Sequence, residues 1–184
     1  EEITWSGRKG AAPRSVSITL MDDDGYNHSR VTVDCANGDQ CVFYEGGKEL
    51  FRGIITSHKQ SNSKKLVVKA YDNAYYLANN KDSFCYTNKT ATDIFNDCMS
   101  RLGMTGNAVN TGYVIPELPK AKTTYYDVML DALSTTYKAT GERYYISSEN
   151  GTIYLRKRVE NACSGYWKLE QSVKPHQLRI LQEH

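Results

Sequence analysis

The residues of this chain that are best suited to chemistry are three consecutive aspartates at positions 22–24, with Gly25 and His28 close behind. Such carboxylates could bind calcium, and a carboxylate near a histidine could transfer protons. A calcium loop of EF-hand type laid over the aspartates would take its first and last ligands from Leu20 and Val31, whose side chains carry no oxygen. Because Asp and Gly also favour tight turns between strands, we interpret this stretch as a polar turn without a metal.

The remaining candidates for nucleophilic catalysis are dispersed along the chain. The four histidines are His28, His58, His176 and His184, and the five cysteines are Cys35, Cys41, Cys85, Cys98 and Cys163. Their odd number and the absence of a C-x-x-C motif indicate neither a disulfide framework nor a zinc ribbon, so free thiols are expected. A Cys35–Cys41 bridge and a catalytic pair of Cys35 with His28 remain open, because such partners meet in space rather than in sequence.

Acidic residues could also supply the two carboxyl groups of a glycoside hydrolase. The candidates are Asp22, Asp23, Asp24, Glu45 and Glu49, and each lies in or beside a predicted turn. The glycines form neither a G-x-G-x-x-G nor a phosphate-loop motif. We therefore predict no catalytic, cofactor-binding or metal-binding residues, no cofactor, and a protein that is not an enzyme.

The composition argues against nucleic acid and membranes as partners. The formal charge of +2 is too small for a nucleic-acid footprint, and the densest basic run, residues 156–158, falls in a strand-like pattern. No apolar run approaches the ~20 residues of a membrane-spanning helix, and no signal peptide is visible. Fourteen tyrosines against four phenylalanines favour a β-rich protein with contact surfaces.

The first 78 residues read as short strands separated by turns. Residues 15–20 alternate between polar and apolar side chains, and residues 30–34 form another short strand-like run. The pairs Asn37-Gly38 and Gly46-Gly47 are typical of tight hairpins. This pattern predicts a small antiparallel β-barrel over residues 1–78.

The next segment, residues 79–158, has the pattern of a small α+β domain with two helices. Capping signals mark their ends: Thr90 and Asp93 before the first helix, Thr124 and Asp127 before the second, and Gly103 and Gly141 after them. A hairpin around Asn150-Gly151 follows. In residues 159–184 the pattern predicts one strand near 166–169, which could return to the barrel. The expected fold class is α+β.

Long co-linear runs of the sequence resemble a known family. They are residues 3–25, 41–57, 65–82, 89–104 and 115–145. Together they resemble the XkdQ/YqbQ-type proteins of PBSX-like defective prophages, a family that is similar to the central hub of contractile tail baseplates. The resemblance covers roughly residues 3 to 158.

The resemblance implies a structural ring component that joins the tail tube to the spike. It implies a trimer in the full-length protein, with the tube and spike proteins of the same particle as partners. The expected location is the bacterial cytoplasm during assembly and then the tail or tail-like particle. The chain is short for such a protein, so we expect the second barrel-like domain to be absent or incomplete, and the residues after Arg158 do not resemble the family.

Six residues of the first segment are the expected determinants of this role: Gly38, Gly46, Gly47 and Gly53 as shapers of hairpins, and Trp5 and Phe51 as contact residues. Simple core packing is an equally good interpretation of Trp5 and Phe51. The alternative function is a cell-wall module that binds glycan or forms part of a tail-associated peptidoglycan hydrolase. A carboxylate pair with a raised pKa in a cleft would favour that alternative.

Overall fold

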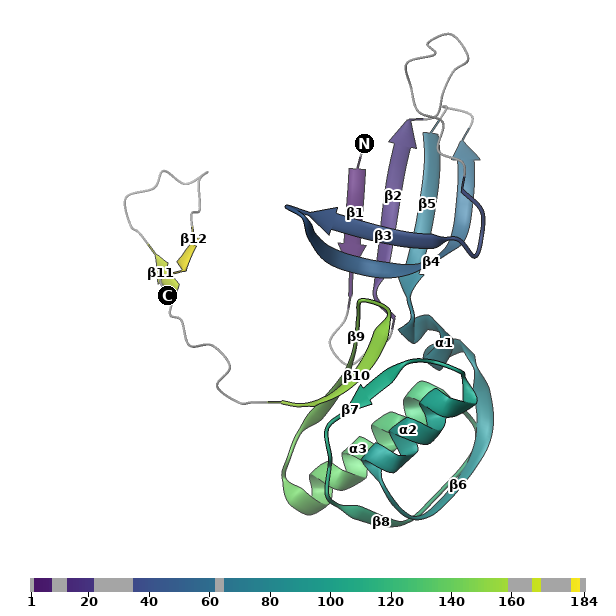
Figure 1. Cartoon of the computed structure of the whole chain (residues 1–184), viewed down its shortest axis with the longest axis vertical. Helices are drawn as coiled ribbons and strands as arrows, with labels where there is room; N and C mark the ends of the chain where they lie inside the picture. Colours follow the sequence, from purple (N-terminus) through teal and green to yellow (C-terminus); the bar gives the residue numbers. More distant parts are fainter. Residues whose placement is uncertain are drawn as a thin grey trace.

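The structure, a computed structural model of the chain, describes residues 2–7, 13–21, 35–61, 65–158, 167–169 and 180–182. Several residues considered above lie outside the described part: the aspartates at 22–24, His28, the predicted strand at 30–34, Cys163, His176 and His184. Figure 1 shows a curved sheet above a unit in which two longer helices lie among strands. Within the described residues, no helix combines the length and the apolar character needed to cross a membrane.

The sheet contains five antiparallel strands in the order β1-β2-β5-β4-β3. They are β1 (Glu2–Ser6), β2 (Ser15–Met21), β3 (Gln40–Glu45), β4 (Lys48–Ser61) and β5 (Lys65–Asp72). In β5 every second side chain is buried, as expected when one face of a sheet covers an apolar core. The predicted strand over residues 15–20 is confirmed as β2.

Strand β4 is the longest strand of the sheet, and it pairs with two neighbouring strands. Its first half pairs with β3, its second half pairs with β5, and the register shifts between Ile55 and Ser57. Gly53 lies where the two ladders meet, opposite both Cys41 and Asp72. A Cβ atom on Gly53 would lie 2.1 Å from the carbonyl oxygen of Tyr71, so only glycine allows this approach. Gly53, predicted to shape a hairpin, lies inside strand β4 of the β3–β4 hairpin and not in its turn, and its role there is to allow the close approach of β5.

The described strands curl but do not close into the predicted barrel. Strands β1 and β3 are the two edges of the sheet, and no ladder joins them within the described residues. The hairpin glycines behave as expected, since Gly38, Gly46 and Gly47 have φ angles of 100°, 55° and 79° that other residues rarely adopt. The turns could therefore be predicted from neighbouring residues in the sequence. Closure of the sheet could not, because it depends on pairing between distant segments.

Below the sheet, three helices and five strands form the second unit. The elements are α1 (Ala74–Asn79), β6 (Lys81–Thr90), α2 (Ala91–Arg101), β7 (Gly106–Ala108), β8 (Val114–Thr124), α3 (Tyr125–Thr140), β9 (Tyr144–Glu149) and β10 (Thr152–Lys157). Strands β6 and β8 form a two-stranded antiparallel ribbon, and β7, β10 and β9 form a second small sheet. Helices α2 and α3 pack on each other and contact strands of both sheets.

The two longer helices begin and end where their capping residues predicted. Thr90 and Asp93 form a complete capping box on α2, in which each side chain bonds the other residue's backbone N–H. Thr124 accepts from the Asp127 backbone N–H at the start of α3, and Gly141 ends that helix in the left-handed conformation. These caps satisfy backbone groups that a helix end leaves unpaired. This explains why the ends of α2 and α3 could be predicted from the sequence.

The apolar core is divided between the two units. The sheet has a cluster of six buried residues: Val16, Phe51, Ile55, Leu66, Val68 and Ala70. The second unit has nineteen, beginning with Ala74 and Leu77 of α1 and ending with Leu155. Phe51 is 1% exposed and is a core residue, whereas Trp5 is 46% exposed. The division of the chain into domains at residue 78 stays a prediction.

The strand predicted near residues 166–169 is present as β11 (Trp167–Leu169). It pairs antiparallel with β12 (Ile180–Gln182), which the sequence pattern did not indicate. Within the described part of the chain, neither strand pairs with the five-stranded sheet. A return of this segment to the predicted barrel therefore remains untested.

Candidate functional site

The first edge of the sheet carries apolar side chains that are left uncovered. Ile3 and Trp5 of β1 stand opposite Ile18 and Val16 of β2, and directly opposed residues share one face of a sheet. Val16 is fully buried on that face, but Ile3 and Trp5 are 47% and 46% exposed. An edge strand that combines unpaired backbone groups with apolar side chains is a surface suited to contact with another chain.

The opposite edge, β3, presents Tyr44, which is 56% exposed. Next to it, the guanidinium of Arg52 holds the carboxylate of Glu49 through two hydrogen bonds of 2.9 and 2.6 Å. These bonds keep the pKa of Glu49 below its usual range. Glu49 is therefore ionised at neutral pH and is a poor general acid, so this predicted candidate for glycoside cleavage finds no support.

A partly buried ion pair joins the sheet to the second unit. The Nε atom of Arg14, just before β2, lies 3.2 Å from Oδ2 of Asp72 at the end of β5. The same guanidinium donates to the carbonyl oxygen of Ser148 in β9. The backbone N–H of Ala74 donates to Asp72 Oδ1 at 3.1 Å, which ties α1 to the same carboxylate. One carboxylate thus organises the point where the two units meet.

The protonation of Asp72 reflects its burial. Loss of solvent raises the pKa of this carboxyl group, and the bonds from Arg14 and from Ala74 oppose that rise only in part. The Asn73 side chain adds a further link at 2.7 Å to the carbonyl oxygen of Gly151, in the turn between β9 and β10. Trp5 touches this junction as well, since the Arg14 guanidinium lies 5.9 Å from its ring centre.

Beside the junction lies a cleft of about 640 Å³. We call it the junction cleft, and it is lined by Pro13, Arg14, Asp72, Ala74, Tyr126, Leu130, Leu133, Ser134, Tyr137, Arg143, Tyr144, Tyr145, Ile146, Ser147, Ser148 and Arg158. Helix α3 and strand β9 supply most of its wall. The rest comes from the residues before β2, from the end of β5 and the start of α1, and from the segments beside β9 and β10. The hydroxyl of Ser148 is buried and has no hydrogen-bond partner within the described residues.

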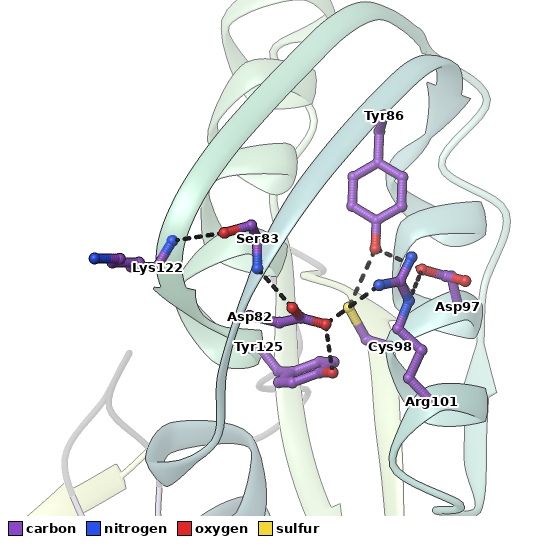
Figure 2. A network of polar contacts seen from close by, with 8 residues as sticks. All are labelled: Asp82, Ser83, Tyr86, Asp97, Cys98, Arg101, Lys122 and Tyr125. Carbon is purple, nitrogen blue, oxygen red and sulfur yellow. Dashed lines mark hydrogen bonds and ion pairs between the residues drawn. The ribbon is translucent and has the colours of Figure 1, made fainter.

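A second polar cluster, drawn in Figure 2, fixes α2 against its neighbours. Arg101 of α2 bonds Asp97 at 2.8 Å and reaches Asp82 of β6 at 3.4 Å. The hydroxyl of Tyr125, the first residue of α3, donates to the same Asp82 at 3.2 Å. Tyr86 of β6 donates to Asp97 at 2.6 Å. Three elements are joined by these bonds, which is a structural arrangement.

The cysteine inside this cluster is not set up as a nucleophile. Cys98 is fully buried, and burial raises the pKa of its thiol to about 11. Burial and the bond to Asp97 likewise raise the pKa of Tyr86. Because the thiolate is the reactive form of cysteine, Cys98 behaves as a small core residue at neutral pH.

The other predicted candidates do not converge on one site. Cys35 and Cys41 are both free thiols, so the Cys35–Cys41 bridge is not formed, and burial raises the pKa of Cys41. His58 is exposed, with Nδ1 3.1 Å from the side-chain oxygen of Asn37. In the part of the chain that the structure describes, no group of three or more His, Cys, Asp or Glu side chains could hold a metal ion.

Sequence reasoning missed the junction, although β5 carried a signal for it. Its alternation continues from Leu66, Val68 and Ala70 to Asp72, so an acidic residue falls on the inward face. A carboxylate at an inward position implies a buried partner. That partner, Arg14, is 58 residues away, and local patterns could not identify it.

Comparison with known proteins gives the family. The YQBQ-like family model matches residues 3–174, so the match continues past Arg158, where we expected it to end. The chain belongs to the YQBQ-like family. It is 34% identical over 175 residues to the phage-like element PBSX protein XkdQ of Bacillus subtilis strain 168, and equally identical to the uncharacterized protein YqbQ of the same strain. In both comparisons 94% of this chain aligns with 52% of the relative, so the chain spans about half the length of these curated relatives.

Solved structures of tail proteins have a similar fold. The 43 kDa tail protein of prophage MuSo2 from Shewanella oneidensis superposes with a TM-score of 0.60 at 12% identity, over 83% of this chain and 53% of that one. A tail protein from Neisseria meningitidis MC58 gives 0.56 at 13% identity, over 78% and 41%. The Escherichia coli c3393 protein gives 0.54 at 13% identity, over 84% and 48%. That protein is a component of the type VI secretion system with structural similarity to the T4 bacteriophage tail proteins gp27 and gp5.

Proposed function

We propose that this chain is a structural component of the baseplate hub of a phage tail or tail-like particle, where it joins the tail tube to the spike. The supporting observation is the uncovered apolar edge of the sheet in a chain of the YQBQ-like family. Tail proteins share the fold, and the similar c3393 protein is itself structurally similar to tail proteins of phage T4. The role we propose is assembly, without catalysis.

The sheet offers two unlike edges for this assembly. Strand β1 exposes Ile3 and Trp5, and strand β3 exposes Tyr44. Two different surface patches on one chain allow head-to-tail contacts, which close into a ring when the rotation between copies permits. A trimer of the full-length protein, in contact with the tube and spike proteins, would use such contacts.

We assign the parts of the chain as follows. Residues 1–78 make the tube-like hub domain, built on the curled sheet. Residues 79–158 make the small α+β domain that supports it. The role of residues 159–184 stays open in this assignment. The change of apolar cluster between Ala70 and Ala74 supports a division a few residues before position 78, with α1 in the second domain.

The alternative of a wall-degrading module finds no specific support in the described residues. It requires two carboxyl groups in a cleft, with the pKa of one of them raised. Asp72 has a raised pKa and lines the junction cleft, but it is the only carboxyl group among the described lining residues. Its charge is also matched by Arg14. The geometry therefore favours a structural role for Asp72.

The test is quantitative mass spectrometry of purified tail particles from the source cell, with peptides of this chain counted against the tube protein. We expect a small fixed number, about three copies per particle, as a cyclic ring of three would give. Particles without the protein, together with its recovery from cell walls, would overturn the proposal in favour of the wall module.

A further inference from the structure

We propose that the junction cleft binds an extended acidic peptide segment of a neighbouring tail protein, which inserts an apolar side chain between α3 and β9. This inference rests on the assembly role proposed above, and it names a binding surface and the chemistry of its partner. Three properties of the cleft support it: its size, its aromatic rim and its charge.

The junction cleft is large enough to hold a side chain of a binding partner. A volume of about 640 Å³ lies inside the range of about 300–1,000 Å³ that is typical of ligand sites. Leu130, Leu133 and Ile146 make its wall apolar, with Ala74 beside the junction. This lining offers an apolar side chain of the partner a place to leave water, which is a favourable transfer.

The rim carries the residue types that dominate protein contacts. Tyr137 and Tyr145 line the cleft and remain 40% and 42% exposed. Tyrosine provides a large contact area at a small cost in side-chain entropy, and it is enriched among residues that dominate binding. Ser148 adds a buried hydroxyl without a partner in the described region, which a backbone group of a bound peptide could satisfy.

The charge of the lining selects an acidic partner. Among the described lining residues, the charged ones are three arginines (Arg14, Arg143 and Arg158) and one aspartate, so positive side chains outnumber negative ones there. Arg14 pairs with the aspartate, and Arg143 lies 4.9 Å from the Tyr137 ring centre on the rim. Arg143 already has contacts within the chain, so a carboxylate on the partner would pair with Arg158 and thereby set the orientation of the peptide.

The location of the cleft fits contact with a neighbour. Its walls come from both units and lie beside the ion pair that joins them. The same Arg14 lies near Trp5 on the open edge of the sheet. A segment in the cleft would therefore hold the two units together near the surface that we expect to face other subunits.

The first experiment identifies the occupant in place. Tyr145 is replaced by the photo-crosslinking residue p-benzoylphenylalanine in the full chain, inside cells that assemble particles, and crosslinked peptides are identified by mass spectrometry. Tyr76 receives the same replacement as a control, because it is 41% exposed and does not line the cleft. We expect crosslinks from Tyr145, and not from Tyr76, to a segment of another tail protein that carries acidic residues beside a large apolar one.

The second experiment measures binding of a synthetic peptide copy of that segment by fluorescence anisotropy. Arg158→Glu should weaken binding by about tenfold or more, as expected when a favourable charge contact becomes repulsive. Lys138→Glu is the matched control, since it makes the same charge change on exposed α3 surface outside the lining and should alter binding less than about twofold. Ser134→Trp should block the cleft by volume, whereas Ser100→Trp on α2 should not.

Crosslinks from Tyr145 only to copies of this chain would overturn the proposal, as would their absence from particles that contain the chain. Equal peptide affinity of the wild type and the Arg158→Glu variant would do the same. These outcomes leave the hub assignment intact, because that assignment fails only if the chain is missing from particles.

Discussion

The two units of the molecule differ in the size of their buried apolar cores. In the α+β unit, nineteen buried residues form one cluster, and both longer helices are capped by side chains. In the five-stranded sheet the buried cluster has six residues, while Ile3 and Trp5 continue its apolar face into solvent. The α+β unit thus has the larger buried core, and the sheet has an apolar edge that another chain could cover.

This difference separates residues that matter for folding from residues that matter for assembly. Substitutions in the α+β core should unfold the isolated chain. Substitutions at the β1 edge should leave the isolated chain folded and act only when particles assemble. Variants of the two units test this separation. The largest loss of unfolding free energy is expected for substitutions in the α+β core.

Replacement of Phe95 by Ala should cost about 3–5 kcal/mol of unfolding free energy, because the ring is 1% exposed in the main cluster. Trp5→Ala should cost much less in the isolated chain, since that ring is half-exposed. Urea denaturation followed by circular dichroism measures both. A larger loss for Trp5→Ala than for Phe95→Ala would contradict the contrast between the two units.

Gly53→Ala should destabilise the sheet by about 1–3 kcal/mol, since the added Cβ atom meets the Tyr71 carbonyl oxygen and β4 must shift. Ser57→Ala, four residues further along the same strand, serves as the control and should change stability by less than about 0.5 kcal/mol. The expected result is a lower urea midpoint for the first variant alone. Equal midpoints would show that the two ladders on β4 do not meet as described.

Thr90→Ala should remove the capping box of α2 and cost about 1 kcal/mol. Thr124→Ala removes the matching cap of α3 and should have a similar effect. Similar losses in two different helices would show that the effect comes from capping and not from the surroundings of one residue. Thermal unfolding monitored by circular dichroism would register each loss. The control Thr87→Ala, exposed on β6, should leave the transition unchanged, and an equal shift in this variant would contradict the capping explanation.

The smallest predicted effect is a pH dependence from Asp72. Its folded-state pKa is raised above the ordinary 3.8, so the folded chain holds this proton more tightly than the unfolded chain does. The resulting stabilisation is complete below 3.8 and is lost as pH rises through the raised pKa. Asp72→Asn has no such group, so the unfolding free energy of the wild type relative to this variant should fall across that window.

The pH dependence of stability has the opposite sign for three other carboxyl groups, those of Glu49, Asp93 and Glu142. Hydrogen bonds lower their pKa values, so they stabilise the folded chain above the ordinary carboxyl range and lose that effect as pH falls. Because both proteins contain them, their contributions cancel in the difference between the wild type and Asp72→Asn. A difference that rises with pH would show that the bond to Arg14, and not burial, controls Asp72.

The sequence predicted the elements whose signals are local. Helices α2 and α3 were found because Thr90, Thr124 and Gly141 mark their ends within a few residues. Strand β8 was missed because Pro116 and Pro119 argue against a strand. The structure tolerates both prolines since β8 pairs with one neighbour only, β6, within the described residues.

What the sequence could not predict depends on contacts between distant segments. The predicted barrel was not found among the described strands, because closure requires β1 and β3 to meet. The junction brings Arg14 together with Asp72 and Ser148, which are 58 and 134 residues away. Local periodicity carries no information about such pairings, and the candidate site was therefore visible only in the folded chain.

The most direct test of the assembly account is the incorporation of edge variants into purified tail particles. The double variant Ile3→Lys with Trp5→Lys is compared with Thr4→Lys, whose side chain lies on the other face of the same strand. We predict that both proteins fold, that Thr4→Lys enters particles at the wild-type ratio to the tube protein, and that the double variant is absent. Incorporation of the double variant at the wild-type ratio would contradict the central claim that the β1 edge is an assembly surface.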